Sequence, residues 1–425
     1  MSALSWSTAL ETIEEDADDR TEAPESPLAA RRSIPNERVA PHLNDEFLDA
    51  TVPQRSDHSI HPDDIPLAGY LLARQVNGRP VEGEHLQLLR NAHDSVREAR
   101  NLLPYGRGNV KEDAIATDGL STFAVNQVRQ EFDDLPVAVS ALLGGAGNCE
   151  EYAALSSLAM AARLPPRAQA RTVTRPFVDH VWSEASIDGN FKDRSHTVVI
   201  DGWRQGPAVF APDHAHAAFT CGLRGHVIDH FESSECVTAE QHGTLLQSYK
   251  ESAQETSFNG MNVEFPTRKL ELDSRSYPLK LKSGVRTHFA KQAASRLEKE
   301  IRPEQAYARA DKSVWRKMKA KVRNTKDCIV TGSGAMRCLG RPEPSHGAIP
   351  AALRSQIQSV GIARQLAPNM SPRELAAVAP RIVEAARTLA LPVPSTARHP
   401  LDMRAEVARR PTESRMRQRR ERQRG

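Results

Sequence analysis

The feature that most constrains the fold is a change of pattern at Pro165 and Pro166. Before these prolines, apolar residues recur every three or four positions, which is the period of an amphipathic helix. After them come short runs of β-branched and aromatic residues, which are typical of strands: "AQARTVT", "FVDHVWSEA", "HTVVIDGW" and "AVFAP". Helices followed by a mostly antiparallel sheet predict an α+β domain.

Three helices are expected before the prolines. The first covers residues 81–103, where apolar residues spaced three and four apart would pack on a core. These residues are Leu86, Leu89, Ala92, Val96, Ala99 and Leu103. A second helix is expected over residues 123–143, and a third from Cys149 to about Arg163, where the prolines end it. One face of the third helix carries Tyr152, Leu155, Ala159 and Ala162.

Composition divides the 425-residue chain further. Residues 1–65 are rich in Ser, Pro, Asp, Glu and Arg without a sustained apolar period, which predicts a disordered leader. We expect a folded domain over residues 66–245, a helical C-terminal region over 246–395 and an Arg-rich tail over 396–425. Helices in the C-terminal region are predicted near residues 287–300, 304–322 and 349–390.

Cysteine number, hydropathy and charge exclude several classes of protein. The cysteines are odd in number and lack regular spacing, so we expect reduced thiols: Cys149, Cys221, Cys236, Cys328 and Cys338. No run of about eighteen apolar residues occurs and the N-terminus lacks signal-peptide regions, so no membrane span is expected. The net charge of +3 does not indicate a nucleic-acid binder. The basic tail "RRPTESRMRQRRERQRG" is either a solvated end, or a nucleic-acid or nuclear-import segment.

The start of the third helix is a candidate site for a nucleophile. In "GGAGNCEEY" the glycines allow a tight turn, Asn148 suits an N-cap, and Glu151 stands where a capping-box partner would. Cys149 then takes the first helical position, where free N–H groups and the helix dipole favour a thiolate and could hold an oxyanion. Glu150 and Glu151 oppose the thiolate, so a cationic partner is needed. The alternative is that Cys149 is a small buried apolar residue.

His180 and Asp201 are the best candidates for a base and for the group that orients it. Strand alternation puts His180 on one face of the first strand and Asp201 on one face of the second. A loop centred between Asn190 and Phe191 would pair the two directly, and a two-residue turn at Gly189 and Asn190 would make them diagonal neighbours.

Two alternatives to this pair remain open. His196 is a rival base, but its alternation places it on the face opposite Asp201, so it ranks second. His180 could also be a core histidine, and Asp201 the start of a turn before Gly202.

Together these segments resemble the transglutaminase-like branch of the papain-type cysteine enzymes. The matching stretches, in order, are "GNCEEYAALSSLAMAARL", "PPRAQARTV", "HVWSEA" and "VVIDGW". Within that superfamily the chain is most similar to the HopX/AvrPphE (XopE) family of bacterial type III effectors, over roughly residues 65–245. By motif, the resemblance implies Cys149 as nucleophile, His180 as base and Asp201 as the residue that orients it. It also implies a transglutaminase-like core.

The resemblance carries expectations about biology as well. It implies secretion through a type III system into plant cells, a leader that serves as secretion signal, a host-protein substrate and a secretion chaperone. The expected location is the host cytoplasm, or the nucleus if the basic tail is an import signal. The Asp-Pro-Thr that often follows the aspartate in the superfamily is missing, and so is the N-terminal Met-Gly of myristoylated relatives.

A second constellation, in "PDHAHAAFTCGLRGHVIDH", suggests a metal site. It contains Asp213, His214, His216, Cys221, His226, Asp229 and His230. Their spacing matches no common zinc finger, so a loop with surface histidines is favoured and no metal or cofactor is expected.

The predicted reaction is cysteine-dependent acyl transfer, with a protease favoured by the resemblance. A transglutaminase or deamidase acting on protein glutamine would use the same triad. A module that binds a host protein without chemistry is the alternative from another class.

Overall fold

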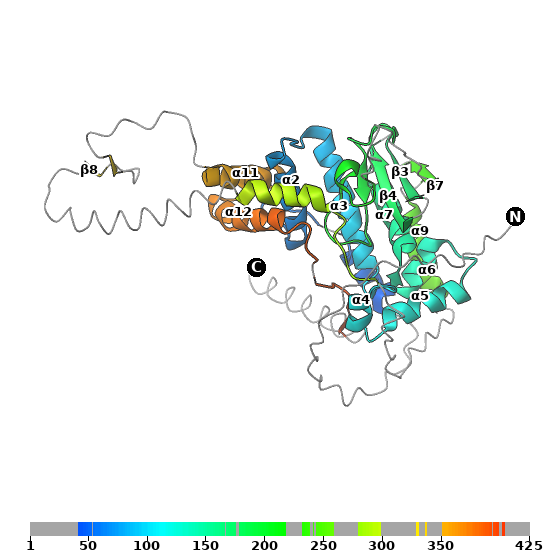
Figure 1. Cartoon of the computed structure of the whole chain (residues 1–425). Coiled ribbons are helices and arrows are strands. Elements are labelled where there is room, and N and C mark those ends of the chain that lie inside the picture. Colours follow the sequence, from blue (N-terminus) through cyan, green and yellow to red (C-terminus); the bar gives the residue numbers. More distant parts are fainter. Residues whose placement is uncertain are drawn as a thin grey trace, which may run out of the picture. The chain divides into compact units, whose positions relative to one another are not determined.

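The computed structural model describes residues 41–52, 54–165, 167–175, 178–217, 232–238, 241, 244–258, 279–298, 329–330, 336–337, 351–392, 394–398 and 402–403. These residues combine helices with a mainly antiparallel sheet, so the predicted α+β class is confirmed (Figure 1). All of them belong to one unit, residues 37–425. Within the described part of the chain, no helix is both long and apolar enough to cross a membrane.

The central sheet has five strands in the order β6-β5-β4-β3-β7. Every neighbouring pair is antiparallel, as the strand runs predicted. The strands are β3 (Gln169–Arg175), β4 (Val178–Ser186), β5 (Val198–Ile200), β6 (Val209–Phe210) and β7 (Glu232–Thr238). Their β-branched and small residues suit close packing, since Ala170, Ala185, Val198 and Ile200 are all fully buried.

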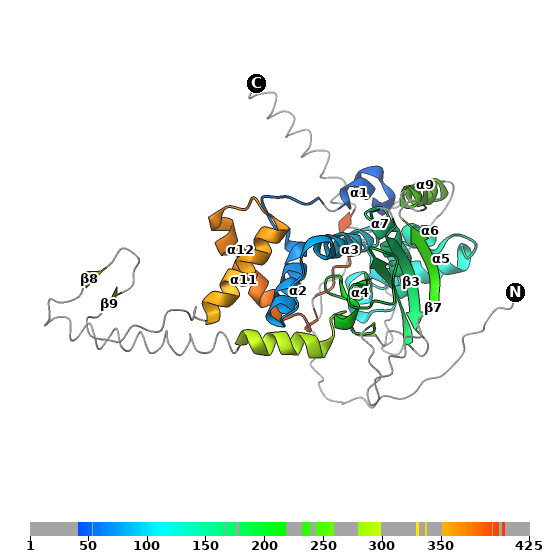
Figure 2. The same ribbon diagram turned by 90° about the horizontal axis from the view of Figure 1, so that it is seen from above.

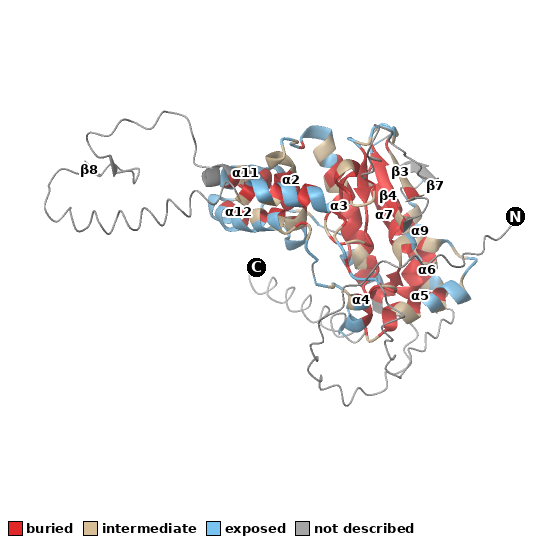
Figure 3. Cartoon of the chain, viewed as in Figure 1, coloured by how far each residue is buried: buried red, intermediate tan, exposed pale blue. Residues whose placement is uncertain are grey.

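Two long helices pack beside this sheet. Helix α7 (Cys149–Ala161) contacts β3, β4 and α3 (Gly83–Leu102), and it ends just before the prolines (Figures 1 and 2). The hydroxyl of Ser183 on β4 donates a hydrogen bond to the carbonyl of Ala153 on α7 at 2.6 Å. Both helices are buried along most of their length (Figure 3). The sheet and the start of α7 are therefore held in a fixed relation.

The single helix predicted over residues 123–143 is wrong, because the structure has two helices there. The structure has α5 (Leu120–Glu131) and α6 (Val137–Gly144), with Pro136 as the residue before α6. Proline has no N–H to continue a helix and disfavours helical geometry in the residue before it, so the chain turns here. Helix α9 (Leu245–Phe258) packs on α6, and α4 (Lys111–Ala116) precedes α5.

The predicted disordered leader is too long. Residues 1–40 lie outside the described part of the chain, but residues 41–65 contain the 3-10 turns η1 (Pro41–Leu43) and η2 (Pro62–Asp64) and helix α1 (Asp45–Ala50). Asn44 caps α1 by accepting a hydrogen bond from the N–H of Glu46 at 2.9 Å. This short segment buries Leu43, Phe47 and Leu48. Three apolar side chains gave too weak a period to detect in the sequence.

The C-terminal helices are part of the same core as the sheet. Helices α11 (Ala351–Leu366) and α12 (Pro372–Arg387) pack on α2 (Ile65–Val76) (Figure 2). The boundary predicted at residue 245 therefore does not divide the chain into separately packed domains. The helix predicted over 349–390 is broken where Ser371 and Glu374 form a capping box.

Further elements complete the described region. Residues 287–298 are helical, and the helix predicted over 304–322 lies outside the described residues. The short strands β1 (Gly106–Arg107) and β2 (Ala146–Gly147) pair in parallel, and β8 (Ile329–Val330) pairs with β9 (Met336–Arg337).

Candidate active site

Cys149 lies at the first position of α7, as the sequence predicted. Gly145 adopts a left-handed φ of 59°, and a Cβ on Gly147 would lie 2.7 Å from the Cβ of Glu151, so the turn requires glycine at both places. The N–H of Asn148 donates to Oε2 of Glu151 at 2.7 Å, which is one half of the predicted capping box. The side-chain oxygen of Asn148 is buried without a hydrogen-bond partner among the described residues. The thiol itself is half-buried.

A residue that sequence analysis missed pairs with the two carboxylates that follow Cys149. Arg129 of α5 donates from Nε to Oε1 of Glu151 at 2.6 Å, and its Nη2 lies 3.6 Å from Oε2 of Glu150. The guanidinium therefore offsets part of the negative charge expected to oppose a thiolate. No local pattern links Arg129 to Cys149, because the contact joins α5 to the start of α7 through the folded chain.

His180 and Asp201 are brought together, though not by the predicted strand pairing. Glu184 pairs with Val199, so Asp201 is offset by two residues from the position opposite His180. The connection is the longer segment 187–197, which makes both predicted loops wrong. An offset of two preserves the side-chain alternation, so the predicted shared face is kept. His180 Nε2 lies 2.7 Å from Asp201 Oδ2, and both side chains are buried.

The charge state of this pair follows from its surroundings. Burial by itself would lower the pKa of His180, but the Asp201 carboxylate and hydrogen bonds to Asp201 and Cys149 raise it to about 9. Burial would likewise raise the pKa of Asp201, yet His180 and His214 hold it well below its usual range. At neutral pH the pair is therefore an imidazolium and a carboxylate. Because Nε2 bonds Asp201, Nδ1 is the ring nitrogen left for the thiol.

Asp201 has a second histidine partner, His214. His214 Nε2 lies 3.1 Å from Asp201 Oδ2, and its Nδ1 accepts a hydrogen bond from the N–H of Ala217 at 3.1 Å. Since Nδ1 accepts, the proton of the neutral ring is on Nε2 and is donated to Asp201. The other carboxylate oxygen, Oδ1, accepts from the N–H of Arg204 at 3.0 Å. The expected surface loop is therefore wrong for His214, which is buried against Asp201.

Aromatic rings enclose His180. Its ring centroid lies 5.2 Å from that of Trp203, 5.2 Å from that of His216 and 5.8 Å from that of Trp182. Burial, then the charge of Arg204, lowers the pKa of His216 to about 3, so this ring is neutral. The guanidinium of Arg204 contacts His216 Nε2. Burial lowers the pKa of Arg204, and the charges of the neighbouring Asp201 and Cys149 oppose that effect.

Two arginines bond the backbone of the loop that follows Asp201. Arg100 of α3 donates from Nε to the carbonyl of Gly202 at 3.0 Å and from Nη2 to that of Gly206 at 3.0 Å. It also contacts the carbonyl of Arg204, and Arg107 contacts that of Trp203. Buried hydrogen bonds from charged groups are among the stronger ones in proteins. Residues 202–206 are thus anchored through their backbone.

Glu184, the acidic residue of "HVWSEA", forms a buried ion-pair cluster with two arginines. Its buried carboxylate accepts hydrogen bonds from Arg194 at 2.6 Å, from Arg171 at 2.7 Å and from the Trp182 indole at 3.1 Å. Burial would raise the pKa of Glu184, but Arg194 and Arg171 lower it. This cluster joins β3, β4 and the 187–197 segment, and it orients Trp182 beside His180.

The rival site residues lie elsewhere. His196 is exposed, stacks on His85 with ring centroids 4.2 Å apart, and has Nδ1 2.9 Å from Asp193. Among the residues that the structure describes, no group of three His, Cys, Asp or Glu side chains could hold a metal ion. Four members of the second constellation lie outside those residues: Cys221, His226, Asp229 and His230.

The site therefore combines a His180–Asp201 pair joined at 2.7 Å with Cys149, which is among the groups that raise the pKa of His180. His214, Arg204 and the aromatic rings surround this pair. No protein-family model matches the sequence, and neither a curated protein nor a solved structure was found to match it.

Proposed function

We propose that this protein is a cysteine-dependent acyl-transfer enzyme that acts on protein substrates, with protease activity as the favoured reaction. The observation that carries the proposal is His180, which bonds the Asp201 carboxylate through Nε2 at 2.7 Å and whose pKa that carboxylate and the neighbouring Cys149 raise to about 9. An imidazolium beside a thiol at a helix N-terminus favours the reactive thiolate. A small core cysteine needs none of these partners.

The proposed reaction has two halves. The thiolate of Cys149 attacks the substrate carbonyl carbon, and the N–H groups at the start of α7 stabilise the oxyanion, since the first amides of a helix lack intrahelical partners. The C–N bond then breaks, His180 Nδ1 donates its proton to the leaving amine, and a thioester remains. In the second half His180 accepts a proton from water, which attacks the thioester and releases the carboxylic acid. Asp201 stabilises the imidazolium throughout.

The same triad permits a glutamine side chain as substrate. Attack on the amide carbon would release ammonia, and the thioester would then pass to an amine in a transglutaminase or to water in a deamidase. Incubation with a protein substrate separates the three reactions by mass spectrometry. Protease activity yields two fragments, deamidation a glutamate in an intact chain, and transglutamination a covalent adduct.

We also propose that the chain has a transglutaminase-like core and belongs with the HopX/AvrPphE (XopE) type III effectors. A cysteine that begins a helix beside an antiparallel sheet, with the histidine on one strand and the aspartate just after the next, supports this. On this proposal the substrate is a plant protein, reached after type III secretion into the host cytoplasm. The basic tail, with its nuclear and nucleic-acid interpretations, lies almost wholly outside the described residues.

The test is the rate of iodoacetamide alkylation at Cys149 as a function of pH, measured by peptide mass spectrometry. We expect Cys149 to react at pH 6 at least about tenfold faster than an unactivated thiol, and to lose this advantage in His180→Ala. His196→Ala, which removes an exposed histidine, is the matched control and should change nothing. Reaction of Cys149 at the rate of an ordinary thiol in the folded wild type would falsify the proposal.

A further inference from the structure

A cavity of about 450 Å³ lies beside the loop of Asp201 but outside the triad. Its wall includes Gln205, Gly206 and Pro207 of that loop, whereas Cys149 and His180 do not line it. Most of the remaining wall comes from α1, α3 and the segment that follows α12, with further contributions from η2, α2, β1, α12 and Ser283. This volume is in the range that encloses a small metabolite.

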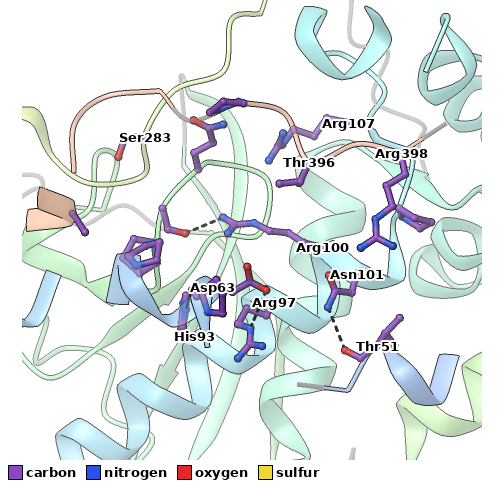
Figure 4. Close-up of a pocket in the computed structure, with 18 of the residues that line it drawn as sticks. Thr51, Asp63, His93, Arg97, Arg100, Asn101, Arg107, Ser283, Thr396 and Arg398 are labelled. Carbon is purple, nitrogen blue, oxygen red and sulfur yellow. Dashed lines mark hydrogen bonds and ion pairs between the residues drawn. The ribbon is translucent and has the colours of Figure 1, made fainter. Parts of the chain in front are cut away.

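Arginines dominate the polar lining of this cavity. Arg97, Arg100, Arg107 and Arg398 line it, and Asp63 is the single acidic residue in the lining. Figure 4 shows Arg100 extending across the middle, with Arg107 and Thr396 on one side and Asp63, Arg97 and His93 on the other.

Not all of this positive charge is balanced. Arg97 Nη1 lies 3.2 Å from Asp64, and Arg107 Nη1 lies 2.9 Å from Asp113. Arg100 differs, because no carboxylate of the described residues lies within ion-pair distance of it and its partners are carbonyl oxygens. Its Nη1 makes no hydrogen bond to a described residue. Burial, then the charge of Arg107, lowers the pKa of Arg100 to about 10, so it remains a cation at neutral pH.

Other lining residues are apolar or carry hydroxyl groups. Phe47, Leu389 and Pro394 contribute hydrocarbon surface, and Thr51 and Thr396 contribute hydroxyls. A cavity whose wall combines cations with hydrocarbon surface suits a ligand with an anionic and an uncharged end.

We propose that this cavity binds a small organic phosphate, with the phosphate on Arg100 and the organic part against the apolar wall. Nη1 of Arg100, which makes no hydrogen bond to a described residue, can donate to a phosphate oxygen, and guanidinium groups form strong charge-assisted hydrogen bonds with phosphate. A phosphate monoester carries close to two negative charges at neutral pH, which suits several arginines better than a single carboxylate does. Nothing in this assignment depends on the acyl-transfer proposal.

The test is isothermal titration of the full chain with two organic phosphates, adenosine 5′-monophosphate and glucose 6-phosphate. Adenosine, glucose and inorganic phosphate are the matched ligands. We expect at least one organic phosphate to bind with a Kd below about 1 mM, at least about tenfold tighter than its uncharged counterpart and than inorganic phosphate. Added salt should weaken binding.

Three variants locate the binding. Arg100→Gln and Arg398→Gln should each weaken the Kd at least about tenfold, since each removes a charged donor. Arg381→Gln, which removes an exposed arginine of α12 outside the cavity, should leave it unchanged. Arg100 also bonds the Asp201 loop, so Arg100→Gln could unfold the protein. In that case the Kd of Arg398→Gln is the deciding measurement.

Failure of both organic phosphates to bind overturns the proposal, as does equal binding of the uncharged ligands or of inorganic phosphate. Titration of Cys149→Ala separates this result from the proposed function, because that variant lacks the thiol and keeps the cavity.

Discussion

At the level of single residues, His214 is the group whose role follows most directly from its contacts. It donates to the same carboxylate oxygen that bonds His180, and backbone N–H groups fix its ring. It does not contact the thiol, so it acts as a positioning residue that holds Asp201 in place. In the sequence it lies two residues from His216 in an expected surface loop, but the folded chain buries His214 and half-buries His216.

Replacement of His214 should therefore weaken the triad without abolishing it. In His214→Leu, which has no donor, we expect alkylation of Cys149 at pH 6 to slow by about three- to tenfold, the equivalent of one buried hydrogen bond. The loss in His180→Ala should be larger. Rescue by His214→Gln, whose side-chain amide can still donate to Asp201, would separate positioning from simple loss of packing. An unchanged rate and pH profile in His214→Leu would contradict the role.

The pKa of His180 also makes a prediction about stability. It is raised from 6.5 to about 9 in the folded chain, so its contribution is complete below pH 6.5 and is lost as the pH rises through 9. Wild type should lose up to about 3 kcal/mol of unfolding free energy between pH 6 and pH 9.5 relative to His180→Gln. Urea unfolding at the two pH values measures this difference. Equal pH dependence of the two proteins would show that His180 is not protonated in the folded state.

At the level of elements, the turn before α7 has little tolerance for added side-chain atoms. A Cβ at Gly147 would lie 2.7 Å from the Cβ of Glu151, whose carboxylate caps the helix that Cys149 begins. Gly147→Ala should destabilise the protein by about 1–3 kcal/mol and slow the alkylation of Cys149. Gly361→Ala on α11 is the control, because a Cβ added there would meet no atom of the described residues within 4 Å. That variant should be neutral or more stable by up to about 1 kcal/mol.

Elements and their faces were predictable where a strong local signal exists. The Cys149 helix, the antiparallel strands and the shared face of His180 and Asp201 follow from periodicity alone. The exact pairing did not, because an offset of two residues leaves the hydrophobic alternation unchanged and depends on how the 187–197 segment folds. Pro136 is a recognisable helix breaker in the sequence. The break between α5 and α6 was not predicted, because apolar residues continue on both sides of this proline.

At the level of the whole molecule, one core joins segments that composition had separated. Leu67 of α2, Ile200 of β5, Ile362 of α11 and Ile382 of α12 belong to a single buried cluster. The cavity wall likewise combines residues near both ends of the described chain. Long-range packing of this kind leaves no local pattern, which is why the cavity and Arg129 could not be predicted from the sequence.

Residues 202–206 are anchored through their carbonyl oxygens, and this determines which positions of the site can accept other amino acids. Every amino acid supplies a backbone carbonyl. The hydrogen bonds from Arg100 and Arg107 therefore do not depend on which side chains occupy positions 203 to 205. Those side chains include Trp203 and Arg204, which face His180 and His216. Under the proposed function, substrate preference can therefore change along this loop while the Asp201 carboxylate stays in place.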